Sequence, residues 1–250
     1  MLPELLNVFN ETLKPQTFPV GVNLLKTHHE NLNVRVKNKK ITICQQVAYS
    51  RYYGWSTLCD KYSSFCVLGA SCSGLIRIPE RVVNGEVNCG VYQKNSEAAQ
   101  KMQELMPRIS DEIYGVLTYP INRPLEGLLP DLVVFYCNTA QAMRMVQAFL
   151  YHEGGEFNFK SSGDAGVCSR GIAEVYKNQK PVIEIPCLGD RRFAMAQDFE
   201  MIVAFPYLYA EIVIEGLTCT HKAGIRYPIP FQMPENCELP KIFTTLKSDL

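Results

Sequence analysis

The sequence predicts an α+β fold, with a mixed sheet and packed helices. Short apolar runs such as residues 132–136 are typical of buried strands, and stretches such as residues 140–151 have the apolar spacing of an amphipathic helix. With 47% hydrophobic and 20% charged residues, the 250-residue chain can bury a sizeable core. It contains no internal repeat and no dividing linker. We therefore predict one compact domain over residues 1–250, and leave open two lobes that meet near residue 130.

Apolar spacing predicts the elements of the first third of the chain. A spacing of four between apolar residues predicts a short helix over residues 4–13, which Pro15 ends. Strands are expected at residues 18–25, 34–36 and 41–43. Cys44 then lies near the start of another helix, where the helix dipole stabilises a thiolate. His28 and His29 lie in a polar linker and are expected to be solvated.

The remaining elements follow from the same patterns. Residues 63–74 are dense in small side chains, which suit either a close approach to a ligand or a tightly packed helix. Further helices are expected at residues 97–106, 140–151 and 207–217, and further strands at residues 132–136, 182–185 and 200–205. Ser96 is expected to cap the first of these helices, and the last is expected to end at Gly216 or soon after it. The second helix has a predicted core stripe, Met143, Val146 and Leu150. The proline-rich segment 222–240 is expected to wrap the surface in extended form.

The charge pattern argues against nucleic acid and membranes as partners. Lys and Arg number 25, as do Asp and Glu, and no run of like charge exceeds residues 37–40, so we expect no nucleic-acid footprint. No uncharged apolar run is long enough to span a bilayer, and the N-terminus lacks the pattern of a signal peptide. We therefore expect no membrane partner and a cytoplasmic protein.

The ten cysteines are many for a chain in a reducing compartment. Exposed thiols are open to oxidation, so these cysteines are expected to be buried, metal-binding or reactive. Each one taken alone is more simply a small buried hydrophobic residue. Such tolerance of thiols also fits an anaerobe.

Residues 161–192 combine several features of a binding site. Glycines mark a tight turn at Gly163, Gly166 and Gly171. Cys168 opens a predicted helix after this turn, and the strand at 182–185 leads to Cys187 and a second turn at residues 189–192. Two cysteines, free backbone N–H groups and two arginines would thus face one place. This combination suits a bound metal cluster, an anionic ligand, or both.

Several stretches together resemble one family. They are VLTYPINR (116–123), PDLVVFYCNTAQAMRMVQAFLYHEGG (130–155), SSGDAGVCSRGIAEVY (161–176), IPCLGDRRFA (185–194), THKAGIRYPIP (220–230), CQQ (44–46) and CVLGA (66–70). Over about residues 18–230 the chain is similar to the uncharacterised ArCR family, domain of unknown function 169, found mainly in anaerobic archaea and bacteria. The resemblance implies a cytoplasmic protein of anaerobic metabolism and brings no activity with it. At its first motif the chain has Ile43 before the cysteine, where the family commonly has tyrosine.

The resemblance also sorts the cysteines. Those that coincide with family motifs are Cys44, Cys66, Cys168 and Cys187. Four thiolates are what a [4Fe–4S] cluster or a tetrahedral zinc ion requires. We therefore expect an iron–sulfur protein with a redox or accessory role. Zinc is the lesser alternative, because its usual short-spaced cysteine pairs are absent.

Two other functions remain open, and so does whether the protein is an enzyme. In the first, a small anion or acyl thioester binds without metal at the turn, and Cys168 is a nucleophile. The residues expected to bind the anion are Ser162, Gly163, Gly166, Arg191 and Arg192. In the second, the protein docks to a redox partner or a larger anaerobic enzyme through its proline-rich tail, with Tyr227 and Phe231 as contacts.

Overall fold

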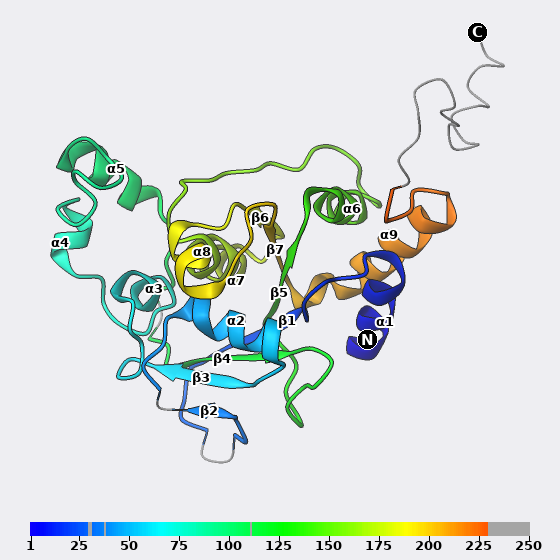
Figure 1. The fold of residues 1–250 in the computed structure, drawn as a ribbon, viewed down its shortest axis with the longest axis horizontal. Coiled ribbons are helices and arrows are strands. Elements are labelled where there is room, and N and C mark those ends of the chain that lie inside the picture. Colours follow the sequence, from blue (N-terminus) through cyan, green and yellow to red (C-terminus); the bar gives the residue numbers. More distant parts are fainter. Residues whose placement is uncertain (30–31, 38, 111, 230–250) are drawn as a thin grey trace, which may run out of the picture.

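The sheet runs through the whole molecule (Figure 1). The computed structural model describes residues 1–29, 32–37, 39–110 and 112–229. In this part of the chain seven strands form one open sheet in the order β2-β3-β4-β1-β5-β7-β6. The strands are β1 (Val20–Leu25), β2 (Val36–Lys37), β3 (Thr57–Asp60), β4 (Gly115–Pro120), β5 (Leu132–Cys137), β6 (Val182–Glu184) and β7 (Met201–Pro206). Helices cover this mixed sheet, which confirms the predicted α+β class.

Strand β1 is the centre of the sheet. It pairs antiparallel with β4 on one side and with β5 on the other. The sheet is therefore continuous across residue 130, which lies between β4 and β5. Only β2 and β3 pair in parallel among the described strands.

Helices pack on both faces of the sheet. They are α1 (Leu2–Thr12), α2 (Ile43–Tyr53), α3 (Val67–Cys72), α4 (Glu80–Val83), α5 (Ser96–Leu105), α6 (Thr139–Phe149), the π-helix η1 (Gly166–Glu174), α7 (Val175–Asn178), α8 (Leu188–Ala194), the short 3-10 helix η2 (Tyr207–Tyr209) and α9 (Ala210–Lys222). Side chains alternate along β5, so Val134 and Tyr136 face one core with α2, α3 and η1. Val133 and Phe135 face a second core with α1, α6 and α9. The first of these faces holds the predicted cysteine site.

The predictions for most of the longer elements are confirmed. The helices at 4–13, 97–106 and 140–151 and the strands at 18–25, 132–136, 182–185 and 200–205 all form within a few residues of the expected bounds. The strand at 41–43 is wrong, because Thr42 caps α2 and Ile43 opens that helix. Ile41 makes only one bridge, to Ser64. Asn95 rather than Ser96 caps α5.

Strands β3 and β4 were not predicted, because polar side chains interrupt their apolar pattern. Thr57 and Thr118 are fully buried between the sheet and α2. Their hydroxyl oxygens lie 2.8 Å apart, and Ser50 of α2 lies 2.8 Å from Thr118. Gln46 donates to Thr57 at 3.1 Å. A buried network of hydrogen bonds thus replaces the hydrophobic contacts that sequence patterns detect.

Two helices differ from their predicted course. Helix α9 runs past Gly216. A side chain at this position would lie 2.6 Å from the carbonyl oxygen of Ala148. The glycine therefore allows close packing on α6 and does not end the helix. The core face of α6 is one residue out of phase with the predicted stripe. Met143 is 38% exposed, whereas Ala142 and Met145 are buried. Of the segment 222–240, Lys222 ends α9, and residues 230–240, with Phe231, lie outside the described residues.

Candidate functional site

Four helix starts lie together on one face of the sheet, and each has one of the four predicted cysteine ligands. Helices α2 and η1 pack against each other and against α3 and α8 (Figure 1). Cys44 is in the first turn of α2, and Cys168 is in the first turn of η1. Cys66 and Cys187 are the N-cap residues of α3 and α8. The N–H groups at a helix start favour negative charge, but at Cys44 and Cys187 the opposite effect of burial on the thiol pKa is larger.

Two of these helix starts are capped in a way that holds the sulfur in place. Thr42 accepts a hydrogen bond from the Gln45 N–H at 3.1 Å, and Gln45 accepts one from the Thr42 N–H at 2.9 Å. The Thr42 hydroxyl also lies 2.9 Å from Cys44 Sγ. In α3, Cys66 Sγ accepts from the Gly69 N–H at 3.4 Å, so a thiol takes the place of the usual capping hydroxyl.

The four cysteines come near one another across these helices. Cys44 Sγ is 3.7 Å from a backbone carbonyl oxygen of α8, the helix that Cys187 caps. A methyl group on Gly69 would lie 3.8 Å from Cys168 Sγ, so η1 brings this cysteine against the helix that Cys66 caps. Cys168 is buried, and the other three are half-buried. The fold thus gathers into one neighbourhood residues from four distant segments.

Burial dominates the acid–base behaviour of two of the thiols. It raises the pKa of Cys44 to about 12, with smaller contributions from the carboxylate of Asp190 and from Cys66. Burial also raises the pKa of Cys187 to about 12, and Asp190 again adds to the effect. Both thiols are therefore protonated at neutral pH in the metal-free protein, and a metal must displace these protons to bind.

Cys72 is a fifth cysteine at the site, which the family motifs did not single out. It lies in α3 and is fully buried, with its Sγ 3.9 Å from Met106 Sδ. A hydrogen bond with Cys72, followed by burial, raises the pKa of Cys168, and Cys187 contributes further. Cys72 lies in the short helix that Cys66 caps and that contacts η1, and its spacing from Cys66 gave no signal for this in the sequence.

The Asp190 carboxylate joins two of the helix starts. It is fully buried, and Oδ2 accepts hydrogen bonds from the N–H of Cys187 at 3.0 Å and of Val167 at 3.2 Å. Its Oδ1 accepts from the Tyr136 hydroxyl at 3.3 Å. A side chain on Gly166 would collide with this carboxylate, so only glycine fits there. The signal in the sequence was the spacing of Cys187 and Asp190, which matches a capping box.

The turn predicted to bind an anion uses its polar groups internally. Ser162 donates to the carbonyl oxygen of Asp164 at 3.3 Å, and the Gly163 N–H donates to Ser161 at 3.2 Å. The first N–H groups of η1 face the Asp190 carboxylate, which occupies the position expected for a bound anion. The chain therefore supplies its own anion at this turn.

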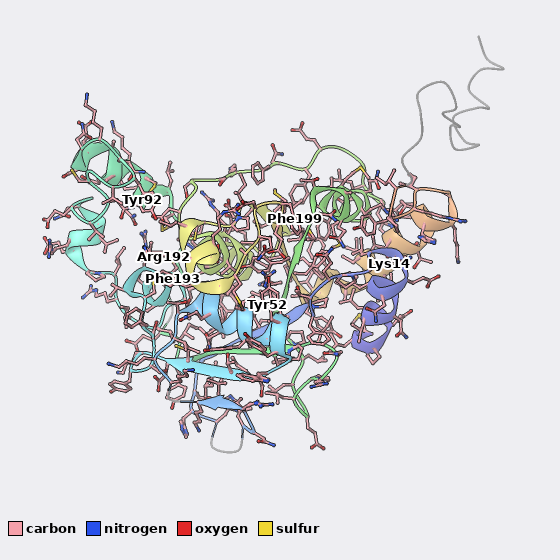
Figure 2. The ribbon with its side chains drawn as sticks, in the orientation of Figure 1. Lys14, Tyr52, Tyr92, Arg192, Phe193 and Phe199 are labelled. Atoms are coloured by element: carbon pink, nitrogen blue, oxygen red, sulfur yellow. The ribbon has the colours of Figure 1, made fainter. Side chains whose placement is uncertain are left out.

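The two predicted arginines lie in helix α8 rather than in a turn, which corrects the expected second turn at residues 189–192. Arg191 donates to the carbonyl oxygen of Gln197 at 2.9 Å and pairs with Asp198 at 3.2 Å. Arg192 lies over the ring of Phe193, 5.8 Å from its centroid, and Figure 2 shows both on α8. Anion binding by these arginines stays a prediction.

The arrangement does not fit a single metal ion. Among the described residues, no group of three or more His, Cys, Asp or Glu side chains has its donor atoms placed to hold one ion. A tetrahedral zinc ion needs four ligand atoms around one point, with sulfurs at about 2.3 Å from the metal, and the described residues hold no such set. A four-iron cluster is larger than one ion and holds its four thiolates farther apart.

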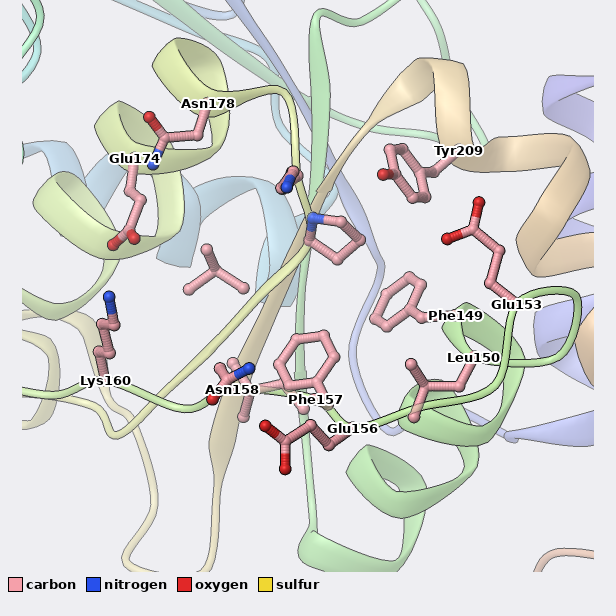
Figure 3. A pocket seen from close by; sticks show the side chains of 14 residues that line it. Phe149, Leu150, Glu153, Glu156, Phe157, Asn158, Lys160, Glu174, Asn178 and Tyr209 are labelled. Carbon is pink, nitrogen blue, oxygen red and sulfur yellow. The ribbon is translucent and has the colours of Figure 1, made fainter.

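A separate pocket lies beside the edge strand β6. Its volume is about 460 Å³, and none of the predicted site residues lines it. Figure 3 shows Lys160 and Glu174 on one side of it and Tyr209 on the other. The rings of Phe149 and Phe157 stack in its wall with centroids 5.8 Å apart.

The fold and the site together define a class: an α+β protein in which four cysteines from distant segments lie at the starts of four helices that pack together. Comparison with known proteins then identifies the family. The chain belongs to the uncharacterised ArCR family, whose model matches residues 8–216. The resemblance predicted from its motifs is therefore confirmed.

A relative of the chain is found in an archaeon. The chain is 33% identical over 172 residues to an uncharacterised protein of Methanocaldococcus jannaschii, and the match covers 65% of this chain and 72% of the relative. No solved structure matches the chain. Among the described residues, no helix has the length and apolar character needed to cross a membrane.

Proposed function

We propose that the protein binds a [4Fe–4S] cluster through Cys44, Cys66, Cys168 and Cys187, and that it has a redox or accessory role in anaerobic metabolism. The observation that supports the proposal is that these four cysteines lie at the starts of α2, α3, η1 and α8, which pack together on one face of the sheet. Four thiolates are the usual protein ligands of such a cluster, which supplies one-electron transfer when bound.

The residues around the sulfurs suit this role. Backbone N–H groups donate to Sγ of Cys66 and Cys187, and such hydrogen bonds raise the potential of a bound cluster. Burial of Cys168 limits the access of water to that side of the site. The buried Asp190 holds η1 and α8 in register, so the distance between Cys168 and Cys187 is set before a cluster arrives.

A partner protein is part of the proposal. Exposed apolar side chains flank two of the cysteines: Phe65 (67% exposed) and Val67 lie on either side of Cys66, and Leu188 (54% exposed) follows Cys187. Exposed apolar groups that gather around a site are typical of interaction surfaces. A redox partner docked there comes within a short distance of the sulfurs, as electron transfer requires.

We also propose that the protein acts in the cytoplasm of an anaerobe. The described cysteines are free thiols, and three of the four at the site are half-buried rather than fully enclosed. Thiols persist in a reducing compartment.

Anaerobic purification tests the proposal. We expect brown protein whose visible absorbance bleaches with dithionite, with about four irons and four sulfides per chain. Cys66→Ser and Cys187→Ser are expected to lose most of the iron. Cys219→Ser is the matched control, because Cys219 is also half-buried but lies in α9 on the other face of the sheet, and it is expected to keep the iron.

Other outcomes decide between the alternatives. A second outcome is purified protein that contains zinc but no iron, with the zinc lost in the same two variants. This outcome would replace the cluster with a single-ion site, which forms when the helix starts move closer together. Colourless protein without iron or zinc after reconstitution contradicts the proposal and favours a metal-free function. Equal iron content in all three variants contradicts the choice of ligands.

A further inference from the structure

An aromatic stack lies at the C-terminal end of α2, at the opposite end of that helix from Cys44. Tyr49 and Tyr53 are one helical turn apart, and Trp55 follows the helix. The Trp55 ring centroid is 5.0 Å from that of Tyr53 and 5.6 Å from that of Tyr49, where the rings stack. The ring centroids of Tyr49 and Tyr53 are 6.0 Å apart, so the three rings form one cluster, and Tyr53 is 50% exposed, so its ring is open to solvent.

Cations from the neighbouring strand lie over these rings. The guanidinium of Arg35 is 4.2 Å from the centroid of the Trp55 ring. The ammonium of Lys39 is 5.3 Å from the centroid of the Tyr49 ring and 3.2 Å from its hydroxyl. Both cations flank β2, which is the edge strand of the sheet. Positive charge is thus held at the faces of an aromatic stack.

Two more lysines complete the positive surface. Lys37 and Lys40 are exposed and form no ion pair with a described residue. The six residues 35–40 contain four cations and no acidic residue. These lysines are therefore available to an anion that comes from solvent.

We propose that this surface binds nucleotides. We call it the aromatic–lysine shelf and define it as Arg35, Lys37, Lys39, Lys40, Tyr53 and Trp55. A planar base stacks on the exposed ring of Tyr53, and the phosphate of the same nucleotide pairs with the lysines. Every base has a face that can stack, so the shelf binds a nucleotide whichever base it carries, either free or within a single strand.

The shelf is a local feature that the overall charge does not reveal. Equal numbers of basic and acidic residues predicted no nucleic-acid footprint for the molecule as a whole. The parallel pairing of β2 with β3 places the basic segment beside the residues that follow α2. The hydrogen bond from the Arg35 N–H to the Ser56 hydroxyl, at 3.1 Å, ties the two segments together. Stacking groups and cations thus meet only in the folded chain.

Trp55 makes the test direct, because it is the single tryptophan of the chain. Its fluorescence is measured in the full-length protein during titration with adenosine monophosphate and, separately, with an oligothymidylate. We expect saturable quenching that weakens as salt is added. Quenching by both probes identifies free nucleotides as ligands, and quenching by the oligothymidylate alone identifies a single strand.

Matched variants separate stacking from charge. Tyr53→Ala is expected to weaken binding by roughly tenfold or more, the usual loss when a stacking ring is removed, whereas Tyr53→Phe retains binding. Lys37→Gln with Lys40→Gln is expected to weaken binding and reduce its salt dependence. Tyr151→Ala is the control, because Tyr151 has similar exposure, 45%, but lies next to α6 and far from the shelf in sequence and in the fold.

Three results would overturn the proposal. One is the absence of saturable quenching with either probe. Another is quenching that Tyr53→Ala leaves unchanged, which means that charge alone attracts the probe. The third is an equal loss in Tyr151→Ala. Since the shelf and the cysteines are at opposite ends of α2, iron content in the Tyr53 variants reports on the cluster independently.

Discussion

Asp190 shows how one residue organises the cysteine site. Its carboxylate is fully buried, yet it accepts hydrogen bonds from three donors, and burial raises its pKa. Two of these donors are the N–H groups of Cys187 and Val167, at the starts of α8 and η1. The same carboxylate leaves no room for a side chain on Gly166. Gly166 was expected to help bind an anion from solvent, and it is instead required by the carboxylate of Asp190.

The raised thiol pKa values predict slow chemical modification of the metal-free protein. The pKa of Cys44 and of Cys187 is about 12, against 9.0 for an ordinary cysteine. At pH 8 each thiolate population is lower by about a thousandfold, since each pKa unit is a factor of ten. Alkylation with iodoacetamide, followed residue by residue with mass spectrometry, should be slow at both positions in the folded protein and fast in urea.

The direction of the pH effect follows from the same shifts. Each raised pKa means that the folded protein favours the protonated thiol. The contribution of the two thiols to the free energy of unfolding is therefore present below pH 9 and is lost as the pH rises towards 12. Unfolding in urea at several pH values checks this direction. Equal alkylation rates in folded and unfolded protein would contradict the burial of both thiols.

At the scale of elements, helix α2 connects the two candidate sites and is fixed by a buried ion pair. Arg51 donates to both carboxylate oxygens of Glu200, at 2.8 and 2.9 Å, and is 1% exposed. Its guanidinium also lies 3.8 Å from the centroid of the Tyr136 ring. The pair ties α2 to the start of β7, so the position of Cys44 relative to α8 depends on it.

Removing one partner of this pair should be costly. Arg51→Met leaves the Glu200 carboxylate buried without its cation, which is expected to lower the free energy of unfolding by about 3–5 kcal/mol. The measurement is urea unfolding of the metal-free protein. Arg81→Met is the matched control: its pair with Glu86 is 78% and 46% exposed, so the loss should stay below about 1 kcal/mol. Similar losses of unfolding free energy in both variants would show that burial does not make removal of one partner of the Arg51–Glu200 pair more costly.

Some helices and strands were predictable from the sequence, and others were not. Helix α6 was predicted from the apolar spacing of residues 140–151, which is a local signal. Its core face was predicted one residue out of phase, because Ala142 and Ala148 face the core and alanine carries little signal. Strands β3 and β4 were missed because Thr57 and Thr118 are buried for their hydrogen bonds with α2 rather than for hydrophobicity.

At the scale of the whole molecule, the proposed ligands come from segments that span residues 44–187. A cluster held by all four would link α2, α3 and η1, which share one core, and α8, which packs on α2 and η1. Binding should therefore stabilise the whole domain against unfolding and not one loop.

Thermal unfolding checks this coupling. At a free-ligand level of about 100 Kd the stabilisation is about 2.7 kcal/mol, which corresponds to a Tm increase of roughly 5–10 °C for a chain of this size. The reconstituted protein is compared with the metal-free protein under the same reducing conditions, and Cys66→Ser should show no increase. An increase that persists in Cys66→Ser would mean that iron stabilises the protein at another place.

The sequence by itself determined the fold class, the longer helices and strands, the family, and the set of four cysteines, because these depend on local spacing, capping and motifs. Only the tertiary structure decided that the four helices that begin at these cysteines pack together, that Asp190 fills the predicted anion position, and that Trp55 lies beside Arg35 at the edge strand β2. The physical reason is that contacts between distant segments are set by the pairing of strands and the packing of helices, for which one short stretch of sequence contains no signal.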